Sequence, residues 1–110
     1  MDAGSAERLA RNEAFFRQVN ERIREVSPGP EDGRAFEFLC ECADPACTER
    51  IALTCAQYEE VRAKPTRFVL ARGHAARELE QVVARDERHV VVEKRGLAAR
   101  IARRLDPRSA

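Results

Sequence analysis

Apolar residues recur at helical spacing through the first quarter of the chain. Between residues 6 and 26 they fall three, four or seven positions apart, which is the period of a helix with one buried face. Ser5 is placed to cap this helix, and the Pro-Gly-Pro run after Ser27 is expected to end it, because proline lacks an amide donor. The apolar stripe comprises Leu9, Phe16, Val19, Ile23 and Val26, and Phe15 widens it.

The next segment alternates between apolar and polar side chains. Residues 36–42 follow this period, which is typical of a strand with one buried face. The cysteines of the segment share the face of its phenylalanines, whereas Glu41 is expected to point away from them. The Asp-Pro-Ala sequence at 44–46 predicts a turn, and residues 50–53 predict a short return strand.

Short apolar runs separated by turn residues fill the second half of the chain. Thr54 and Gln57 have the spacing of a capping box, which predicts a helix over about 55–63. The other expected elements are strands over 67–71 and 89–93, a short helix over 75–85 with Leu79, Val82 and Val83 facing inward, and a basic amphipathic helix over 94–105 in which Leu97, Ile101 and Leu105 recur.

All four cysteines lie within sixteen residues. Cys40 and Cys42 are two positions apart on the expected strand, so their thiols face one side, and the turn brings Cys47 back toward them. Three converging thiols predict a zinc site, because Zn²⁺ prefers a tetrahedron of cysteine and histidine ligands. The fourth ligand stays open between Cys55, at the first turn of the capped helix, and His74, after the glycine that follows a strand.

These elements predict a single α+β domain over residues 1–110. It has an N-terminal amphipathic helix, a small and mostly antiparallel sheet with a zinc-knuckle hairpin, short helices and a basic C-terminal helix. Residues 1–5 and 106–110 are expected to be flexible ends. With 5 Phe, 1 Tyr and no Trp, the core is largely aliphatic, and a metal ion would help to stabilise it.

The motifs in this chain also carry a resemblance. They are Asn12-Glu13, Phe16-Arg17, Asn20-Glu21-Arg22-Ile23, Cys40-Glu41-Cys42, Asp44-Pro45, Cys47-Thr48-Glu49-Arg50-Ile51, Leu53-Thr54, Tyr58, Pro65-Thr66-Arg67-Phe68, Gly73-His74 and Val90-Val91-Val92-Glu93-Lys94. Together, over about residues 7–95, they resemble an uncharacterised family of small bacterial proteins, chiefly from high-GC, actinobacteria-like soil bacteria. The resemblance implies Cys40, Cys42, Cys47 and His74 as the ligands, with Cys55 outside the motif. It implies no activity.

Other uses of the cysteines remain open. Free cysteines are often small buried hydrophobic residues, and an unmetallated Cys40 and Cys42 pair would suit a thiol-based redox sensor. Two disulfides would be expected in a secreted protein. The polar start of the chain and the lack of a long apolar run instead predict a cytoplasmic protein that does not enter the membrane. His89 opens a strand and is expected at the surface.

No catalytic motif is recognisable. The chain lacks the His-x-Glu and Pro-Cys-x-x-Cys signatures of zinc deaminases, a nucleophile elbow and a phosphate-binding glycine loop. Zinc sites rich in thiolates are mostly structural. We therefore expect a non-enzymatic zinc-binding interaction or regulatory module that recognises a protein partner.

The distribution of charge suggests an alternative function. Charged residues make up 35% of the chain, but the net charge is only +1, so any attraction to nucleic acid must be local. The C-terminal tail could contact nucleic acid or an acidic partner, although no aromatic residues interleave with its basic ones. The basic residues in question are Lys94, Arg95, Arg100, Arg103 and Arg104.

The first helix also allows self-association. Leu9, Phe16 and Ile23 are seven residues apart, and Asn12 lies on the same stripe. An asparagine in such a stripe can fix the register of paired helices. The simplest interpretation is that the stripe packs on the domain's own sheet, and the second is a homodimer formed through this helix.

Overall fold

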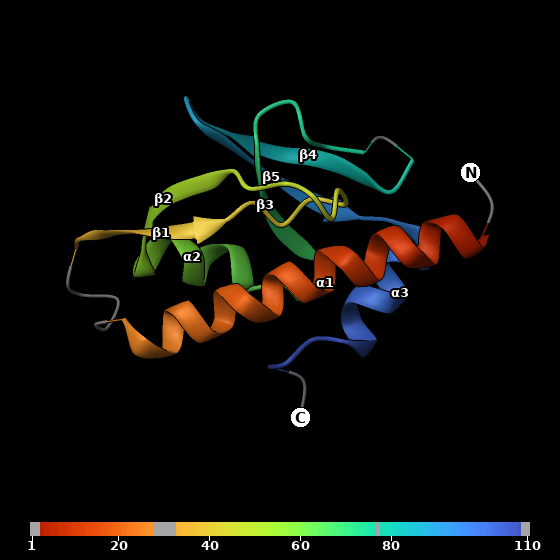
Figure 1. Ribbon diagram of the computed structural model, residues 1–110, viewed down its shortest axis with the longest axis horizontal. Helices are drawn as coiled ribbons and strands as arrows, with labels where there is room; N and C mark the ends of the chain where they lie inside the picture. Colours follow the sequence, from red (N-terminus) through yellow and green to blue (C-terminus); the bar gives the residue numbers. More distant parts are fainter. Residues whose placement is uncertain (1–2, 28–32, 77, 109–110) are drawn as a thin grey trace.

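The computed structural model describes residues 3–27, 33–76 and 78–108, which form three helices and five strands. The α+β class is confirmed, with a helix at each end of the described chain (Figure 1). In chain order the elements are α1 (Ala3–Val26), β1 (Ala35–Leu39), β2 (Arg50–Thr54), α2 (Cys55–Arg62), β3 (Arg67–Ala71), β4 (Glu80–Arg85), β5 (His89–Lys94) and α3 (Gly96–Arg104).

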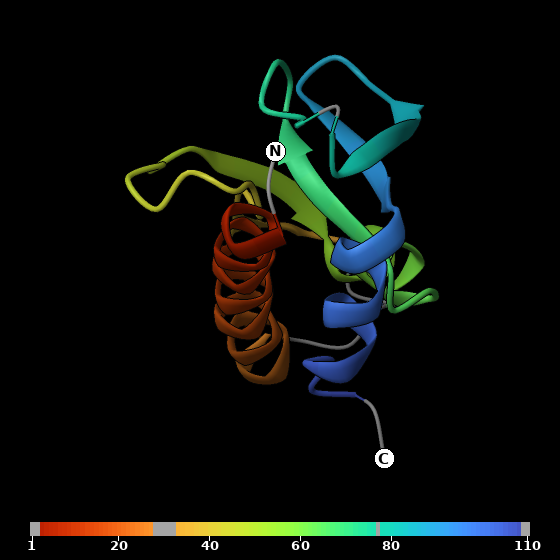
Figure 2. The same ribbon diagram turned by 90° about the vertical axis from the view of Figure 1, so that its right-hand side faces the viewer.

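Within the described ranges the strands form two antiparallel sheets. β1 and β2 make a hairpin in which Phe38 lies opposite Ile51, and the other strands follow the order β3-β5-β4. The amide of Glu41 donates to the carbonyl of Val69 over 2.9 Å, so the chain that leaves β1 links the two sheets. α1 and α3 lie side by side beneath the strands (Figure 2).

Apolar side chains from both sheets and from α2 form the main core. Phe38 and Tyr58 are stacked inside it with their ring centroids 4.6 Å apart. The capping box expected at the start of α2 is present, and the amide of Gln57 donates to Thr54 Oγ1 over 3.1 Å. The buried members of this core are Phe38, Cys40, Cys42, Ile51, Leu53, Tyr58, Val61, Phe68, Val69, Leu70, Val90, Val92 and Ala102.

The buried face of α1 is more polar than the apolar stripe predicted. Phe16 is buried as expected, but Val26 is 84% exposed and Phe15 is 59% exposed, so neither extends the stripe into the core. Glu13 and Arg17 are fully buried on this helix instead. The buried face of α1 therefore combines apolar side chains with charged ones.

Buried contacts of acidic and basic side chains attach α1 to the rest of the molecule. Lys94 Nζ contacts the carboxylates of Glu13 and Glu80, and each of these side chains is at most 1% exposed. Arg17 donates to the carbonyl of Ala102 over 2.7 Å. Charges are costly to remove from water, so each of these groups depends on its partners in the folded state.

A second group of ion pairs ties the C-terminal residues to α1 and α2. Arg62 Nε donates to Glu21 over 3.0 Å, and another Arg62 donor contacts Asp106. Arg108 donates to Glu21 over 2.7 Å and to Glu59 over 2.8 Å. These contacts connect three segments that are far apart in the chain.

The ends of the domain differ from the expectation of flexible termini. α1 begins at Ala3, so Ser5 lies within the helix and does not cap it. Asp106 and Arg108 take part in the ion pairs just described. Residues 1–2 and 109–110, together with the Pro-Gly-Pro run expected to stop α1, lie outside the described residues.

The segment before β5 is strand β4, so the helix predicted over residues 75–85 is wrong. β4 pairs with β5, and a bulge after Val82 interrupts the alternation of its side chains. Leu79 is buried as expected, whereas Val83 is 41% exposed. Pairing with the valine-rich β5 outweighs the helix-like spacing of these apolar residues.

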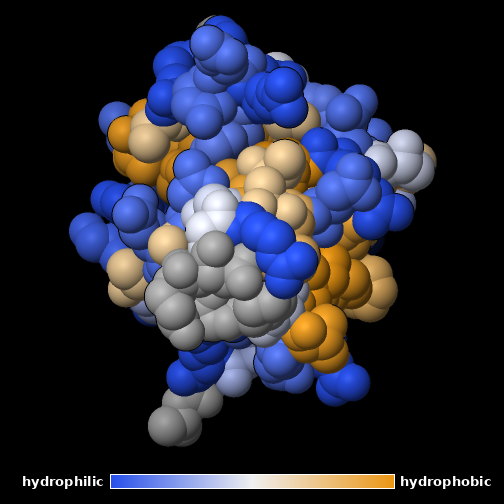
Figure 3. Space-filling model, turned by 90° about the vertical axis from the view of Figure 1, so that its left-hand side faces the viewer, coloured by the Kyte–Doolittle hydropathy of each residue, from blue (hydrophilic) through white to orange (hydrophobic). Residues whose placement is uncertain are grey.

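The face of the molecule at which α1 terminates is mostly hydrophilic, with smaller hydrophobic patches between the hydrophilic regions (Figure 3). Among the described residues, no helix has the length and apolar character needed to cross a membrane.

Candidate metal site

The cysteine loop begins where β1 ends. β1 stops at Leu39, three residues before the end of the predicted strand, because the chain turns from β2 toward β3 at this point. The amide of Cys40 still donates to Glu49 over 3.1 Å, but the next amide donates to β3. Asp44 then closes the expected turn, since its carbonyl accepts from the amide of Cys47 over 3.1 Å.

The second part of the site is the turn that follows β3. Gly73 has a φ of +84°, a conformation that costs little for glycine and is strained for other residues. The amide of His74 donates to the carbonyl of Ala71 over 3.2 Å. This tight turn directs the imidazole of His74 back toward the cysteine loop.

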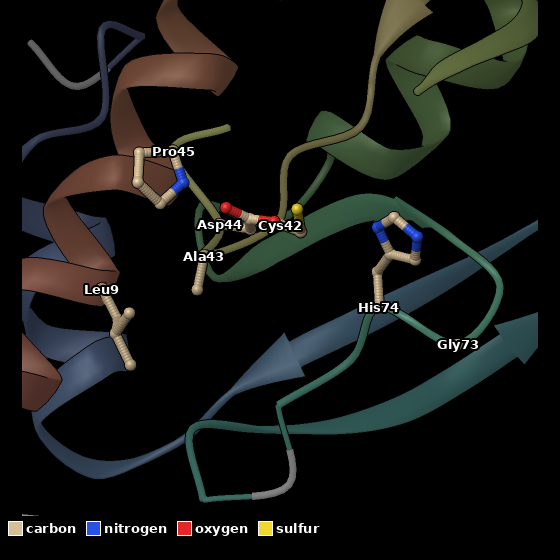
Figure 4. Close-up of a pocket in the computed structure, with 7 residues that line it drawn as sticks. All are labelled: Leu9, Cys42, Ala43, Asp44, Pro45, Gly73 and His74. Carbon is tan, nitrogen blue, oxygen red and sulfur yellow. The ribbon is translucent and has the colours of Figure 1, made fainter. Parts of the chain in front are cut away.

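The two segments bring four potential ligands together. The Sγ atoms of Cys40, Cys42 and Cys47 and a ring nitrogen of His74 all lie within 4.8 Å of one another. Figure 4 shows the sulfur of Cys42 and the ring of His74 facing one another from opposite segments. The cysteine spacing predicted this convergence but left the fourth member open between Cys55 and His74, and the structure brings His74, the residue that the resemblance implied, beside the three sulfurs.

The spacing within the group fits a tetrahedral metal centre. His74 Nδ1 lies 3.6 Å from Cys40 Sγ and 3.6 Å from Cys47 Sγ. Bonds of about 2.3 Å from zinc to sulfur and about 2.0–2.1 Å to nitrogen place those ligand atoms about 3.6 Å apart in a tetrahedron. One ring nitrogen at equal distances from two sulfurs is the arrangement expected around a shared ion.

The inner half of the group is buried. Cys40 and Cys42 are 1% and 2% exposed, whereas Cys47 and His74 are half-buried. Burial raises the pKa of both the Cys40 and Cys42 thiols, and the neighbouring cysteines raise the pKa of Cys40 further. A bound cation would oppose this effect, because metal ligation requires the thiolate.

One backbone amide supports the ligand group directly. The amide of Ala71 donates to Cys40 Sγ over 3.1 Å, and this bond lowers the pKa of the thiol against the larger effect of burial. The donor stands at the end of β3, so the bond also fixes the cysteine loop against that strand. Thiolate is the better acceptor for such a bond.

Glu41 is the residue whose role the sequence did not predict. It points away from the cysteines as expected, but its side chain is 0% exposed and lies in the core. Its carboxylate accepts from Asn20 Nδ2 over 2.9 Å, from Tyr58 OH over 3.2 Å and from the amide of Val69 over 2.9 Å. Glu41 thus anchors the middle of the Cys40-Glu41-Cys42 segment to α1, α2 and β3.

The signal for this anchor was present in the chain. Asn20, Glu41 and Tyr58 all belong to the motifs on which the family resemblance rests. Burial raises the pKa of Glu41, while the donated hydrogen bonds and the charge of Arg17 oppose that rise. The sequence alone could not place Glu41 in the core, because its hydrogen-bond donors come from segments that only the folded structure brings together.

α1 supports the cysteine loop at two further points. Asn20 Oδ1 accepts from the amide of Leu39 over 2.7 Å, and its Nδ2 donates to the Leu39 carbonyl over 2.9 Å. Asn12 Nδ2 donates to the carbonyl of Cys42 over 3.4 Å. Asn12 therefore contacts the loop itself.

The structure does not bring the other candidate ligands into the group. Cys55 is buried at the start of α2 and is absent from the described four-residue cluster. His89 lies at the start of β5, where its Nδ1 is 3.2 Å from Asp86 Oδ1. The four cysteines are free thiols, so the disulfide alternative is not seen.

The basic residues of the tail separate into two groups. Lys94 is the last residue of β5 and is 4% exposed, so it is wrong as a surface contact for nucleic acid. Its ammonium is already occupied by Glu13 and Glu80. The exposed members of the original set are Arg95, Arg100, Arg103 and Arg104.

A shallow hollow opens beside the ligand group. It is lined by Leu9, Cys42, Ala43, Asp44, Pro45, Gly73 and His74, and Figure 4 shows these side chains around it. The group therefore has a buried side toward the core and an accessible side toward solvent.

No family model, curated protein or solved structure matches this chain. The resemblance to a bacterial family therefore stays a prediction drawn from the motifs. The geometry by itself defines three cysteines and a histidine that could hold a metal ion.

Proposed function

We propose that the protein is a non-enzymatic zinc-binding module in which Cys40, Cys42, Cys47 and His74 hold one Zn²⁺. The observation that supports this most strongly is the equal 3.6 Å spacing of His74 Nδ1 from two of the sulfurs. Thiolates favour zinc over hard cations, and four protein ligands fill its tetrahedron. A filled shell leaves no position for a substrate, so the zinc has a structural role.

The proposed role of the module is to present a surface to a protein partner. The hollow beside the ligands supports this, since Leu9 and Pro45 offer apolar contact next to the carboxylate of Asp44. A site that needs three thiolates also suits the reducing cytoplasm, where we place the protein. A capture experiment tests this role. The zinc-loaded wild type should bind a partner protein that a Leu9→Asp variant with normal zinc content fails to bind.

Metal analysis tests the zinc site directly. Freshly purified reduced protein is expected to contain about one zinc per chain, by analogy with other closed four-ligand sites. Cys47→Ser and His74→Ala are expected to lose most of it. Cobalt-loaded protein should show the absorption of tetrahedral Co²⁺ together with a thiolate charge-transfer band.

Cys55→Ser is the matched control, because it removes a buried cysteine outside the group. It should retain the metal. Zinc content below a tenth of the chain concentration in wild-type protein would exclude the proposal. Retention by His74→Ala with loss in Cys55→Ser would move the fourth ligand to Cys55.

A thiol-based redox sensor is a second candidate function, supported by the accessibility of part of the group. Cys47 is half-buried, so hydrogen peroxide can approach its sulfur, and the buried Cys42 lies in the same group as the second thiol. Peroxide would convert one thiolate to a sulfenic acid and release hydroxide. The second thiolate would then displace another hydroxide and form a disulfide, freeing the zinc. Reversible zinc release together with reversible loss of free thiols at low peroxide is the expected result.

A further inference from the structure

The outer faces of α1 and α3 share an unusual composition. Exposed residues of α1 recur three or four positions apart and include three arginines, while the exposed face of α3 carries three more. The two helices lie side by side (Figure 2), and Arg11 of α1 and Arg104 of α3 both contact Glu7, so the two exposed faces adjoin. We call this surface the arginine face, and it comprises Arg8, Arg11, Arg22, Arg100, Arg103 and Arg104.

Few carboxylates neutralise the arginine face. Glu7 is shared by Arg11, at 3.0 Å, and Arg104, at 4.0 Å, and Arg22 Nε lies 3.9 Å from Glu25. Within the described part of the chain, neither Arg100 nor Arg103 has an ion-pair partner. Six arginines therefore face two carboxylates on this surface, so it carries a local excess of positive charge although the net charge of the whole chain is only +1.

Helix stabilisation accounts for only part of this pattern. Arg103 and Arg104 lie in the last turn of α3, where a cation interacts favourably with the helix dipole. Arg100 lies before that turn. Arg8 and Arg11 lie in the N-terminal half of α1, where the dipole gives a cation no such benefit.

An exposed aromatic side chain lies within the same surface. Phe15 is 59% exposed, although it adjoins the buried Phe16 at a ring distance of 6.0 Å. It borders a shallow groove between α1 and the end of α3, which is lined by Arg11, Ala14, Phe15, Gln18, Leu105 and Pro107. An aromatic ring among cations has the components of a stacking platform for a nucleic-acid base.

We propose that the arginine face binds single-stranded nucleic acid, with arginines contacting phosphates and Phe15 stacking on one base. Guanidinium groups pair with phosphate oxygens through two hydrogen bonds. Arg8 and Arg22 are separated by about 21 Å along α1 at 1.5 Å per residue, which is long enough for several nucleotides. A membrane surface fits less well, because interfacial helices bury a row of large apolar residues and this face offers Phe15 almost alone.

Fluorescence anisotropy of a labelled 20-nucleotide oligo-dT with zinc-loaded, full-length protein tests the proposal. Binding should weaken linearly in log–log form with salt, with a slope of about −0.7 for each phosphate contact. Arg100→Ala with Arg103→Ala should reduce the slope by about 1.4, two contacts at about 0.7 each. Phe15→Ala should weaken binding by about tenfold at every salt concentration and leave the slope unchanged.

The matched control is the double variant Arg50→Ala with Arg85→Ala, which removes the same charge from exposed positions on β2 and β4. It should bind like the wild type. Circular dichroism and zinc content verify that every variant is folded. Equal weakening in the control, or no binding at 50 mM salt, overturns the proposal.

Two further probes separate the classes of partner. Vesicles containing anionic lipid should bind more weakly than the oligonucleotide and should be insensitive to Phe15→Ala. Polyglutamate should compete poorly. Stronger binding of either probe, with the same dependence on Arg100 and Arg103, would assign the face to a membrane or an acidic protein and overturn the nucleic-acid proposal.

Discussion

Glu41 shows how a single residue can position a ligand group without joining it. Its carboxylate accepts three hydrogen bonds from three different elements, and each adjacent residue supplies a sulfur to the cluster. Removing the acceptors would leave buried donors without partners, at a cost of about 1–3 kcal/mol for each donor. The cost should appear both in stability and in metal retention.

We therefore expect Glu41→Gln to lower the free energy of unfolding by about 1–3 kcal/mol, because its amide donor would face other donors. Glu41→Ala should lower it further. Denaturant unfolding measures the loss of stability, and zinc transfer to a chromogenic chelator measures the loss of metal retention. Glu37→Ala, at an exposed position of β1, is the control and should change stability by less than about 0.5 kcal/mol. Unchanged zinc transfer in both Glu41 variants would remove its positioning role.

Glu13 predicts a pH dependence of stability. Burial raises its pKa from 4.5 to about 8, with the charge of Glu80 adding to the rise and Lys94 opposing it. The folded protein therefore keeps a proton that the unfolded chain releases near its lower pKa. The contribution favours folding at low pH and is lost as pH rises from 4.5 toward about 8.

Glu13→Gln should flatten this part of the stability profile, because glutamine cannot release the proton. Between pH 6.5 and 8.5 the wild type should lose stability relative to the variant, at no more than about 1.4 kcal/mol per pH unit. Glu25→Gln, at an exposed position, should follow the wild type. Parallel profiles for the wild type and Glu13→Gln would contradict the assignment.

Residue-scale prediction succeeded where the chemistry of a side chain is specific and failed where its partners are distant. Cysteine spacing predicted a converging group, and the resemblance selected His74 over Cys55. Lys94 was misassigned because a lysine in a basic tail usually faces solvent. Its two carboxylate partners come from α1 and β4, which are brought together only by the complete fold.

At the scale of the elements, the turn after β3 is the part of the site with the strictest backbone requirement. Gly73 has a φ of +84°, and an added Cβ would meet no atom within 4 Å. Any cost of Gly73→Ala is therefore conformational, typically about 1 kcal/mol or more. A relaxed turn would also move His74 away from the sulfurs.

Gly73→Ala should consequently lose stability and release zinc faster than the wild type. Gly33→Ala provides the comparison, since Gly33 has a similar φ of +79° and equally open surroundings. It should lose similar stability but hold zinc normally. Stopped-flow chelator assays measure the release rates, and identical rates in the two variants would show that the turn does not control the site.

Most elements could be predicted because their signals are local. The capping box at Thr54, the apolar run of β3 and the valines of β5 each fixed an element with nearly correct bounds. β4 was missed because its apolar residues have helix-like spacing in the sequence. A bulge after Val82 lets the segment pair with β5 despite this spacing, and only that pairing decides between helix and strand. The length of β1 was overestimated because the chain crosses to β3 at Glu41, a contact between distant segments.

At the scale of the whole molecule, the ligand group connects the cysteine loop after β1 with the turn after β3. Only part of these two segments belongs to the main core. The core also contains apolar residues from α2, β3 and β5 that do not depend on the group. Zinc removal should therefore lower Tm by about 10 °C or more while leaving much of the secondary structure in place. Calorimetry and circular dichroism with and without a chelator measure these effects.

Hydrogen exchange locates the change more sharply. After zinc removal the amide of Ala71, which donates to Cys40 Sγ, should lose protection, whereas amides in the centre of β5 should keep theirs. Cys55→Ser should respond like the wild type. Complete loss of protection throughout the sheet would show that the metal supports the entire domain.

The ion pairs of Asp106 and Arg108 have a consequence for synthesis on the ribosome. Until those residues leave the exit tunnel, Arg62 lacks one of its two carboxylate partners, and Glu21 and Glu59 lack the guanidinium of Arg108 that joins them. Native packing of α1 on α2 should therefore be delayed until residues 106–108 have emerged. Stalled nascent chains ending before residue 106 should be cut readily by protease, and those with the full sequence exposed should resist it.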